Sequence, residues 1–529
     1  MKKTKIKALT LLAAAMMVVT MDSCRQASDE IVSNNGLGKN DIDAKRYTEL
    51  WDVMWNGFNT NYPAWELETI DWDEQYTTTH NKLAEIDKEY DDLLADSLKS
   101  DISTDTAAIA KKALQVFKET FAQLHDGHTR VEYLDRATQI RKMVRMGTAY
   151  RTQRENPMAE KSIWDTRYYY ASGEVDTARC WMVSPACTVM KRLTGLLPDM
   201  QKELAELTSS PDKPHAAMTE YIDELRYMTE LLSQVRKDSC MNTLRTLYSS
   251  YTKKLANGNL KALASKYDLP SIPLNDSRAS DMEMFFTKDN IAYYRLSLFD
   301  IPMSSTVIPQ NEDDKAWMKR YQEAVEQWHS KVYELHKNGQ LKGVVLDVRN
   351  NTGGVTLNMA WFVGLLLKGD KFSIGTYKKK NGIGRLDYSA PMDINTLCCG
   401  WNSEDITEPV VVLTNGSSVS CAEASTITAR QMPNAISLGT CTYGAGNALV
   451  GTDPTANSLV GYSGCIGIRN VTPVYAYIPC SVLCYNGFGS IESLGIEPNI
   501  KLEYDKNLYS SSLRDNQLER AFSYIREGK

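Results

Sequence analysis

The stretch "LKGVVLDVRNNTGG", Leu341 to Gly354, sets the fold class of this 529-residue chain. An apolar run rich in Val and Leu passes into charged residues, asparagines and two glycines, as a buried strand followed by a loop does. Similar runs, "NIAYYRLSLF", "EPVVVLTN" and "NAISLGT", alternate with helical patterns such as "DDKAWMKRYQEAVEQWHSKVYELHKNG". Strands and helices in this alternation predict an α/β fold with a largely parallel sheet.

Two loops that follow such strands carry the residues suited to chemistry. "DVRNNTGG" ends at Gly354, and "TNGSSVSCAE" begins at Thr414 and contains three serines, with Ser425 following closely. Loops at the carboxyl ends of parallel strands form the sites of open α/β sheets. We therefore expect a functional site where these two loops meet.

The rest of the chain reads mainly as helices, and its length predicts two or three packing units. Segments such as "DTAAIAKKALQVFKETFAQL" repeat apolar residues at helical spacing before residue 131, and the helical pattern continues to about 280. We predict a helical N-terminal domain over 41–131, a helical insert over 132–280, an α/β core over 281–505 and a C-terminal helix over 506–529.

The N-terminus has the pattern of a targeting segment. Basic "MKKTKIK" precedes the apolar "ALTLLAAAMMVVTM" and then "DSC", which ends at Cys24. This order resembles a bacterial lipoprotein signal over residues 1–23, with Cys24 acylated and a linker over 24–40; secretion with a free or disulfide-bonded Cys24 is the alternative. We expect an exported bacterial lipoprotein of the cell envelope, at the outer membrane and facing the periplasm or the surface, held to the membrane by a lipid anchor.

The composition of the chain indicates which partners and bound groups are expected. The net charge of −6 argues against nucleic acid as a partner. Ten cysteines besides Cys24 allow disulfides in an exported chain, with a connectivity that spacing does not fix. "CSVLC" and the pair His125 and His128 lack a second half at ligand spacing, so we predict neither a metal site nor a cofactor.

Five motifs in order carry a family resemblance: "LHDGHTRV" (124–131), "VVLDVRNNTGG" (344–354), "VVVLTNGSSVSCAEA" (410–424), "LGTCTYGAG" (438–446) and "IESLGIEPNI" (491–500). Together they resemble the C-terminal-processing and tricorn-core family of serine peptidases, peptidase family S41. The resemblance implies a crotonase-like α/β catalytic core after a helical N-terminal region, with the helical insert in the place of a peptide-binding PDZ module. We expect the insert to flank the cleft.

The resemblance places the nucleophile on Ser420, which leaves Ser417, Ser418 and Ser425 as structural residues. The usual lysine base of the family falls on Ala445, and no lysine occurs between Lys380 and Lys501. The histidine-using, tricorn-like branch instead implies His128 as the base. An imidazole with an ordinary pKa near 6.5 suits a general base at neutral pH.

The same resemblance supplies the remaining roles. Glu492 matches the glutamate that orients the histidine, although Gly127 stands where that branch has a linking serine; Asp126 is the local alternative, or a turn residue. The backbone amides of Gly353, Gly354 and Cys421 are expected to form the oxyanion hole. Asp347 and Arg349 are expected to hold the loop, and the Cys421 thiol is a rival nucleophile.

Two functions follow. The first is an exported, membrane-anchored serine endopeptidase that cuts peptides or protein tails. The second is a catalytically inactive relative that binds a peptide or ligand. The absence of HExxH, of G-x-x-x-x-G-K-[ST] and of a G-x-S-x-G elbow argues against other chemistries. Oligomeric state and cleavage specificity are left open.

Overall fold

The computed structural model describes residues 44–96, 102–146, 164–209, 216–237, 241–270, 281–301, 312–381, 384–447, 466–467, 469–479 and 481–528. The predicted signal segment, Cys24 and the linker lie outside the described residues. None of the helices within the described ranges is long and apolar enough to cross a bilayer.

The centre of the molecule is a seven-stranded sheet in the order β13-β10-β9-β6-β5-β4-β3. The five strands from β13 to β5 are parallel, and β4 and β3 are antiparallel additions at one edge. The predicted runs form β5, β6, β9 and β10, so the mixed α/β fold with a largely parallel sheet is confirmed. The strand bounds are β3 Val175–Val183, β4 Met282–Thr287, β5 Ile291–Leu296, β6 Gly343–Asp347, β9 Val410–Thr414, β10 Ala435–Gly439 and β13 Ile500–Lys501.

Helices cover both faces of this sheet because its buried strands are apolar on both sides. Side chains of α13 (Glu312–Lys337) and α14 (Cys421–Arg430) share one core with Val344 and Leu346. The intervening Val345 points to the other face, where it meets Leu518 and Phe522 of α16 (Asn516–Glu527). The C-terminal region thus holds two helices, α15 (Lys506–Ser512) and α16.

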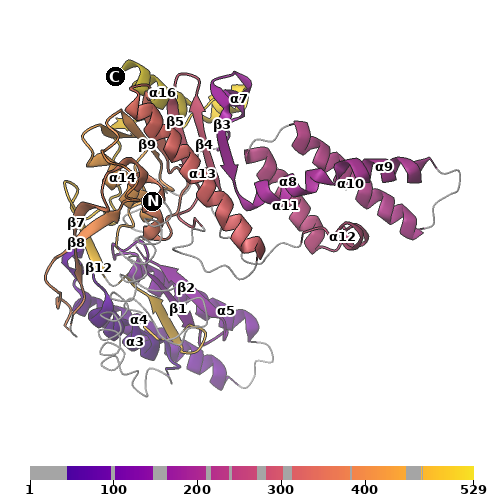
Figure 1. The fold of residues 1–529 in the computed structure, drawn as a ribbon. Coiled ribbons are helices and arrows are strands. Elements are labelled where there is room, and N and C mark those ends of the chain that lie inside the picture. Colours follow the sequence, from indigo (N-terminus) through magenta and orange to yellow (C-terminus); the bar gives the residue numbers. More distant parts are fainter. Residues whose placement is uncertain are drawn as a thin grey trace.

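The N-terminal region packs three helices around aromatic side chains. These are α3 (Tyr47–Asn61), α4 (Trp72–Ala95) and α5 (Ser103–Phe121), with the short η1 (Trp65–Leu67) between the first two. A three-stranded antiparallel sheet, β11-β1-β2, completes this core and lies beside the helices in Figure 1. β1 (Arg130–Leu134) and β2 (Arg141–Arg145) follow the histidine motif directly, whereas β11 (Val474–Tyr477) comes from far along the chain.

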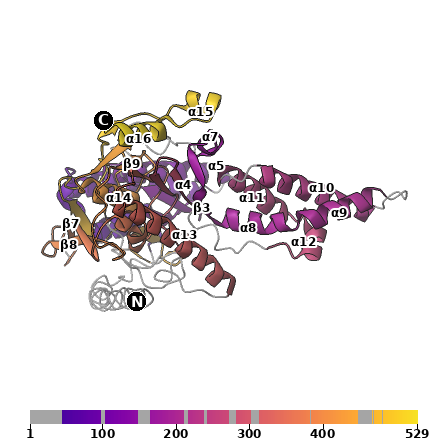
Figure 2. The ribbon, with the colours of Figure 1, turned by 45° about the horizontal axis from the view of Figure 1, so that its top comes forward.

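Residues 164–270 contain both core elements and a helical arm. α7 (Arg167–Ala171) and β3 pack on the central sheet, so part of the predicted insert belongs to the core and the boundary at 281 differs from that in the structure. The arm consists of α8 (Pro185–Gly195), α9 (Leu197–Thr208), α10 (Ala216–Lys237), α11 (Met241–Ala256) and α12 (Lys261–Tyr267), with a core of its own. It projects away from the body in both views (Figures 1 and 2). The arm begins directly after β3, at the edge of the sheet that is remote from β9 and β10. This position differs from the expectation that the insert flanks the cleft.

A third sheet, β12-β7-β8, joins the two main parts. Its strands are β7 (Lys371–Lys379), β8 (Met392–Leu397) and β12 (Ser481–Tyr485), and the short η4 (Thr356–Trp361) and η5 (Val363–Leu366) precede β7. Its β7–β8 hairpin reaches the N-terminal helices, where Arg385 pairs with Asp73 and Lys378 with Glu66. The hairpin therefore fixes the N-terminal region to the core.

Candidate active site

Ser420 lies in a strained backbone conformation between β9 and α14. Its φ is 57° and its ψ is −114°, and it is the N-cap residue of α14. A side chain other than glycine rarely adopts a positive φ, and such strain collects at functional sites because the surroundings must hold it. The half-buried Ser420 is therefore the serine of this turn with the geometry expected of a nucleophile.

The other serines of the turn are buried in the interior. The Ser418 hydroxyl donates to Val348 O at 2.8 Å and accepts from the Asn415 amide at 3.1 Å. The Asn415 side chain accepts from the amides of Ser417 and Asn350, both at 3.0 Å. These contacts bind the β9 turn to the loop after β6, as expected if the neighbouring serines are structural.

The glycine loop after β6 packs directly on Ser420. A Cβ on Gly353, whose φ is +94°, would lie 2.7 Å from the Ser420 Cβ, and one on Gly354 would lie 2.3 Å from Phe299 O. Only glycine allows this approach. The predicted meeting of the two loops is thus seen.

One of the three amides predicted to form the oxyanion hole has a partner within its own loop. The Gly353 amide donates to Asn351 Oδ1 at 2.9 Å, so it is already engaged within the loop. The buried Asn351 is itself fixed, because its Nδ2 donates to Leu296 O at 2.8 Å. Gly354 and Cys421 are therefore better placed than Gly353 to offer an amide to a substrate oxygen in this conformation.

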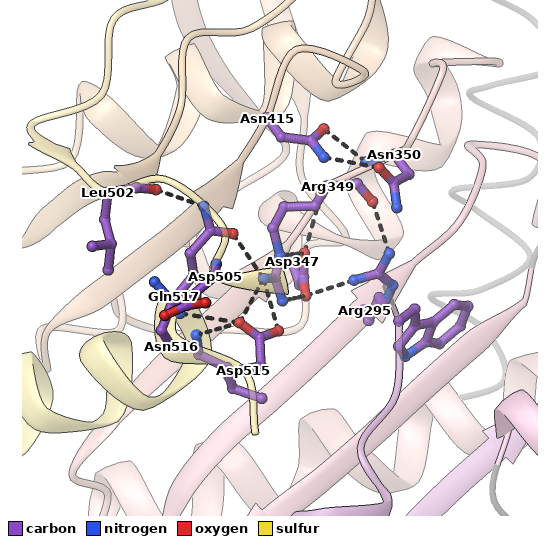
Figure 3. Close-up of polar contacts among 12 residues, drawn as sticks. Arg295, Asp347, Arg349, Asn350, Asn415, Leu502, Asp505, Asp515, Asn516 and Gln517 are labelled. Atoms are coloured by element: carbon purple, nitrogen blue, oxygen red, sulfur yellow. Dashed lines mark hydrogen bonds and ion pairs between the residues drawn. The ribbon is translucent and has the colours of Figure 1, made fainter. Parts of the chain in front are cut away.

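A buried ionic network holds the start of the glycine loop (Figure 3). Arg349 pairs with Asp347 at 2.6 Å and with Asp515 at 2.8 Å, and Arg295 pairs with Asp347 at 2.7 Å. Burial alone would raise the pKa of Asp347, but the two guanidinium groups outweigh it and lower that pKa to about 2. Asp347 and Arg349 are fully buried, which matches the expectation that they hold the loop.

Glu423 connects Ser420 to the "TYGAG" loop. Its carboxylate accepts from the Ser420 amide at 3.0 Å, from Thr442 Oγ1 at 2.6 Å, and from the amides of Gly444 and Ala445 at 2.8 and 2.9 Å. Burial raises the pKa of Glu423, and these four donors act in the opposite direction. Ala445, at the position of the family lysine, is fully buried.

Two carboxylates tie the histidine turn to the same loop. Glu492 accepts from the amides of Gly446 at 2.8 Å and Asn447 at 2.9 Å, and also from the Gly127 amide. Asp126 accepts from the His128 amide at 2.8 Å and from Asn447 Nδ2 at 3.0 Å. Glu492 therefore reaches the histidine turn through the backbone of Gly127, and Asp126 acts as a turn residue.

His128 and His125 have different surroundings. His128 is half-buried in the turn that leads into β1. His125 Nδ1 lies 2.8 Å from Glu68 Oε2, and the His125 amide donates to Glu68 Oε1 at 2.8 Å. The Glu68 carboxylate also accepts from the Tyr62 hydroxyl. His125 is thus held by Glu68, and the network of Glu423, Asn447 and Glu492 links the turn of His128 to Ser420.

The Cys421 thiol is unsuited to nucleophilic attack. It is buried and donates to Gly354 O at 3.0 Å. Burial raises the pKa of this thiol to about 12, and the thiolate is the reactive form. No disulfide joins two of the described cysteines, and within the described ranges no group of three or more His, Cys, Asp or Glu side chains is arranged to hold a metal ion.

Replacing Gly353 with alanine is expected to lower kcat about 100-fold, because the new Cβ displaces Ser420. Gly369→Ala is the matched control, since Gly369 also has a positive φ of +77° but open space around it. The Gly369→Ala variant should lose only about 1 kcal/mol of stability through backbone strain and should keep its activity. Peptide-hydrolysis assays and thermal melts of both variants test this, and equal kcat values would contradict it.

Three residues of the network were not among the predicted site residues. Glu423 is part of the quoted motif, but its four donors come from two loops 19 or more residues apart. Asn351 and Asn447 also bond to distant backbone or side-chain groups. For Asn351, its place shortly before the glycine pair was the available sequence signal, because asparagine side chains often fix turns.

Residues 291–463 match the model of peptidase family S41. Solved structures with similarity include mature CPAF complexed with lactacystin, at 12% identity and a TM-score of 0.42 over 92% of this chain and 99% of that one. The photosystem II D1 C-terminal processing protease has 18% sequence identity and a TM-score of 0.26, with 40% of this chain and 42% of that chain covered. The tricorn protease has 16% identity and a TM-score of 0.24, with 48% of this chain and 23% of that chain covered. No curated protein matches the sequence. The matched segment contains three of the five motifs, at 344–354, 410–424 and 438–446, so it supports the resemblance to this family and indicates a peptidase.

Proposed function

We propose that the protein is a serine endopeptidase of family S41 in which Ser420 attacks the scissile carbonyl and His128 accepts the serine proton. The strained Ser420 backbone, packed against Gly353, is the observation that carries the proposal. A neutral hydroxyl needs an adjacent base, and the lysine of the family is replaced by the buried Ala445. His128 is the base that the motif offers.

The surrounding contacts give each neighbour a role in this mechanism. The oxyanion that forms on the substrate carbonyl is stabilised by backbone amides, with Cys421 and Gly354 as the donors. Glu423 fixes the Ser420 amide, and Glu492 fixes the backbone beside His128. Both glutamates thereby set the position of the reacting groups without transferring a proton.

A fluorophosphonate probe tests the nucleophile. Wild-type protein is expected to be labelled, and Ser420→Ala to lose the label. Ser425→Ala is the matched control: Ser425 lies one turn further along α14, is buried, and its hydroxyl bonds to no described group. Labelling of Ser420→Ala at the wild-type level would contradict the proposal, and unlabelled wild-type protein would favour the inactive, ligand-binding alternative.

We also propose that the protein is exported and anchored through acylated Cys24. The basic and apolar runs before "DSC" support this. Metabolic labelling with a palmitate analogue is expected to mark the wild-type chain and not Cys24→Ala. Equal labelling of the two chains would show that Cys24 is not the anchor.

A further inference from the structure

Three exposed large apolar side chains lie on or beside β2, an edge strand of the β11-β1-β2 sheet. Ile140, Met143 and Val471 are 58%, 48% and 66% exposed. The two turns that carry Ile140 and Val471 are neighbours, because Leu134 N donates to Pro473 O at 2.8 Å and Arg141 donates to Thr472 O. We call this surface the sheet-end patch; it begins at these two turns with Ile140 and Val471 and continues along β2 through Arg141, Lys142 and Met143 to Arg145, which pairs with Arg130 at the other end.

The sheet-end patch is positively charged in a chain whose net charge is −6. Lys142 is half-exposed and Arg145 is exposed, and neither forms an ion pair with a described residue. The Arg141 guanidinium is partly buried and donates to Thr472 O. The nearby carboxylates are buried: Glu132 pairs with Arg469, and Asp135 lies within the β1–β2 turn. The surface thus offers cations and apolar side chains together.

The described chain begins beside this patch. The Tyr47 hydroxyl, near the start of α3, donates to Asp135 Oδ2 at 2.9 Å, and the Asp135 amide donates to Ile140 O at 3.0 Å. Cys24 precedes Ala44, the first described residue, by a segment that spans at most about 70 Å when fully extended. A lipid on Cys24 would therefore tether the protein through a segment that enters the described structure near the turn of Ile140.

We propose that the sheet-end patch docks on an anionic lipid bilayer, an inference that rests on the proposed anchor at Cys24. Apolar side chains beside cations match the boundary between acyl chains and anionic headgroups. A lipid anchor together with a basic surface is the two-signal arrangement that gives stable membrane attachment.

Docking in this way sets which part of the molecule faces the bilayer. Arg145, at one end of the patch, pairs with Arg130 of β1, and Arg130 follows His128 by two residues. A bilayer on the patch would therefore lie close to the histidine turn. The arm points away from the N-terminal region that carries the patch (Figure 1).

Vesicle binding tests the patch separately from the anchor. The mature chain from residue 24, with Cys24→Ser so that no acyl chain contributes, is mixed with phosphatidylcholine vesicles with or without phosphatidylglycerol. Binding is expected only to the anionic vesicles and should weaken with salt. Lys142→Glu with Arg145→Glu should weaken it at least about 25-fold, from roughly fivefold for each cation, and Ile140→Asp with Val471→Asp should weaken it at least about tenfold.

Leu386→Asp is the matched control, because Leu386 is 64% exposed but lies on the β7–β8 hairpin, whose Arg385 contacts Asn59 at the opposite end of α3. This variant should bind as the wild type does, and thermal melts check that all variants fold. Equal vesicle binding by the wild type and the patch variants overturns the proposal, as does absence of binding to anionic vesicles. Slower cleavage of acidic peptides with unchanged vesicle binding would make the patch a substrate surface instead.

Discussion

Replacing His128 with alanine is expected to lower kcat on the order of 10⁴-fold, about as much as Ser420→Ala does. A serine and its base act as a unit, so removing either one removes most of the chemistry. The double variant is expected to be no slower than either single variant, which separates a shared mechanism from two independent effects. Steady-state hydrolysis of a peptide substrate by the four proteins measures this.

His125→Gln is the control for this prediction. Glutamine can still donate a hydrogen bond to Glu68, so the fold around the turn and most of the activity are expected to remain. In the wild type, kcat/KM should rise between about pH 6 and 7.5, because only the neutral imidazole accepts a proton. An unchanged rate in His128→Ala, with loss of activity in His125→Gln, would move the role of base to His125.

The core strands could be predicted from the sequence because each is mainly apolar. β6 and β9 are buried on both faces and therefore consist mostly of Val and Leu. β2 could not be predicted in this way, since "RKMVR" is charged at three of its five positions. β11 joins the same sheet from more than 300 residues away, which no local pattern encodes.

The residues of the candidate site likewise fall into those that a local pattern predicts and those that depend on distant contacts. Ser420 and the glycine pair lie in loops that directly follow apolar strands, so their meeting follows from the parallel sheet. Glu423 and Glu492 instead work through backbone amides of distant loops, and an amide has no sequence signal. The engagement of the Gly353 amide by Asn351 depends on a side-chain rotamer and likewise could not be read from the motif.

Replacing Arg349 with alanine is expected to lower the free energy of unfolding by about 3–5 kcal/mol. The change leaves Asp347 and Asp515 as buried carboxylates that have lost a partner. Arg349→Lys is also expected to destabilise, because one ammonium cannot replace the forked guanidinium that bonds Asp347, Asp515 and Gln517. The control Arg226→Ala removes an exposed pair with Asp223 and should cost less than about 1 kcal/mol in denaturant titrations.

Acid should weaken the fold through the same network. The pKa of Asp347 is about 2 in the folded chain and about 3.8 when unfolded, so its ionised form stabilises the fold above the unfolded value. This contribution, about 2 kcal/mol, is complete at neutral pH and is lost as the pH falls from about 5 toward 2. Asp347→Asn should therefore show a shallower loss of stability over that range than the wild type, because the amide does not titrate. Denaturant titrations at each pH would detect the difference, and parallel pH curves for the two proteins would mean that Asp347 does not control the acid response of the loop that carries Gly353.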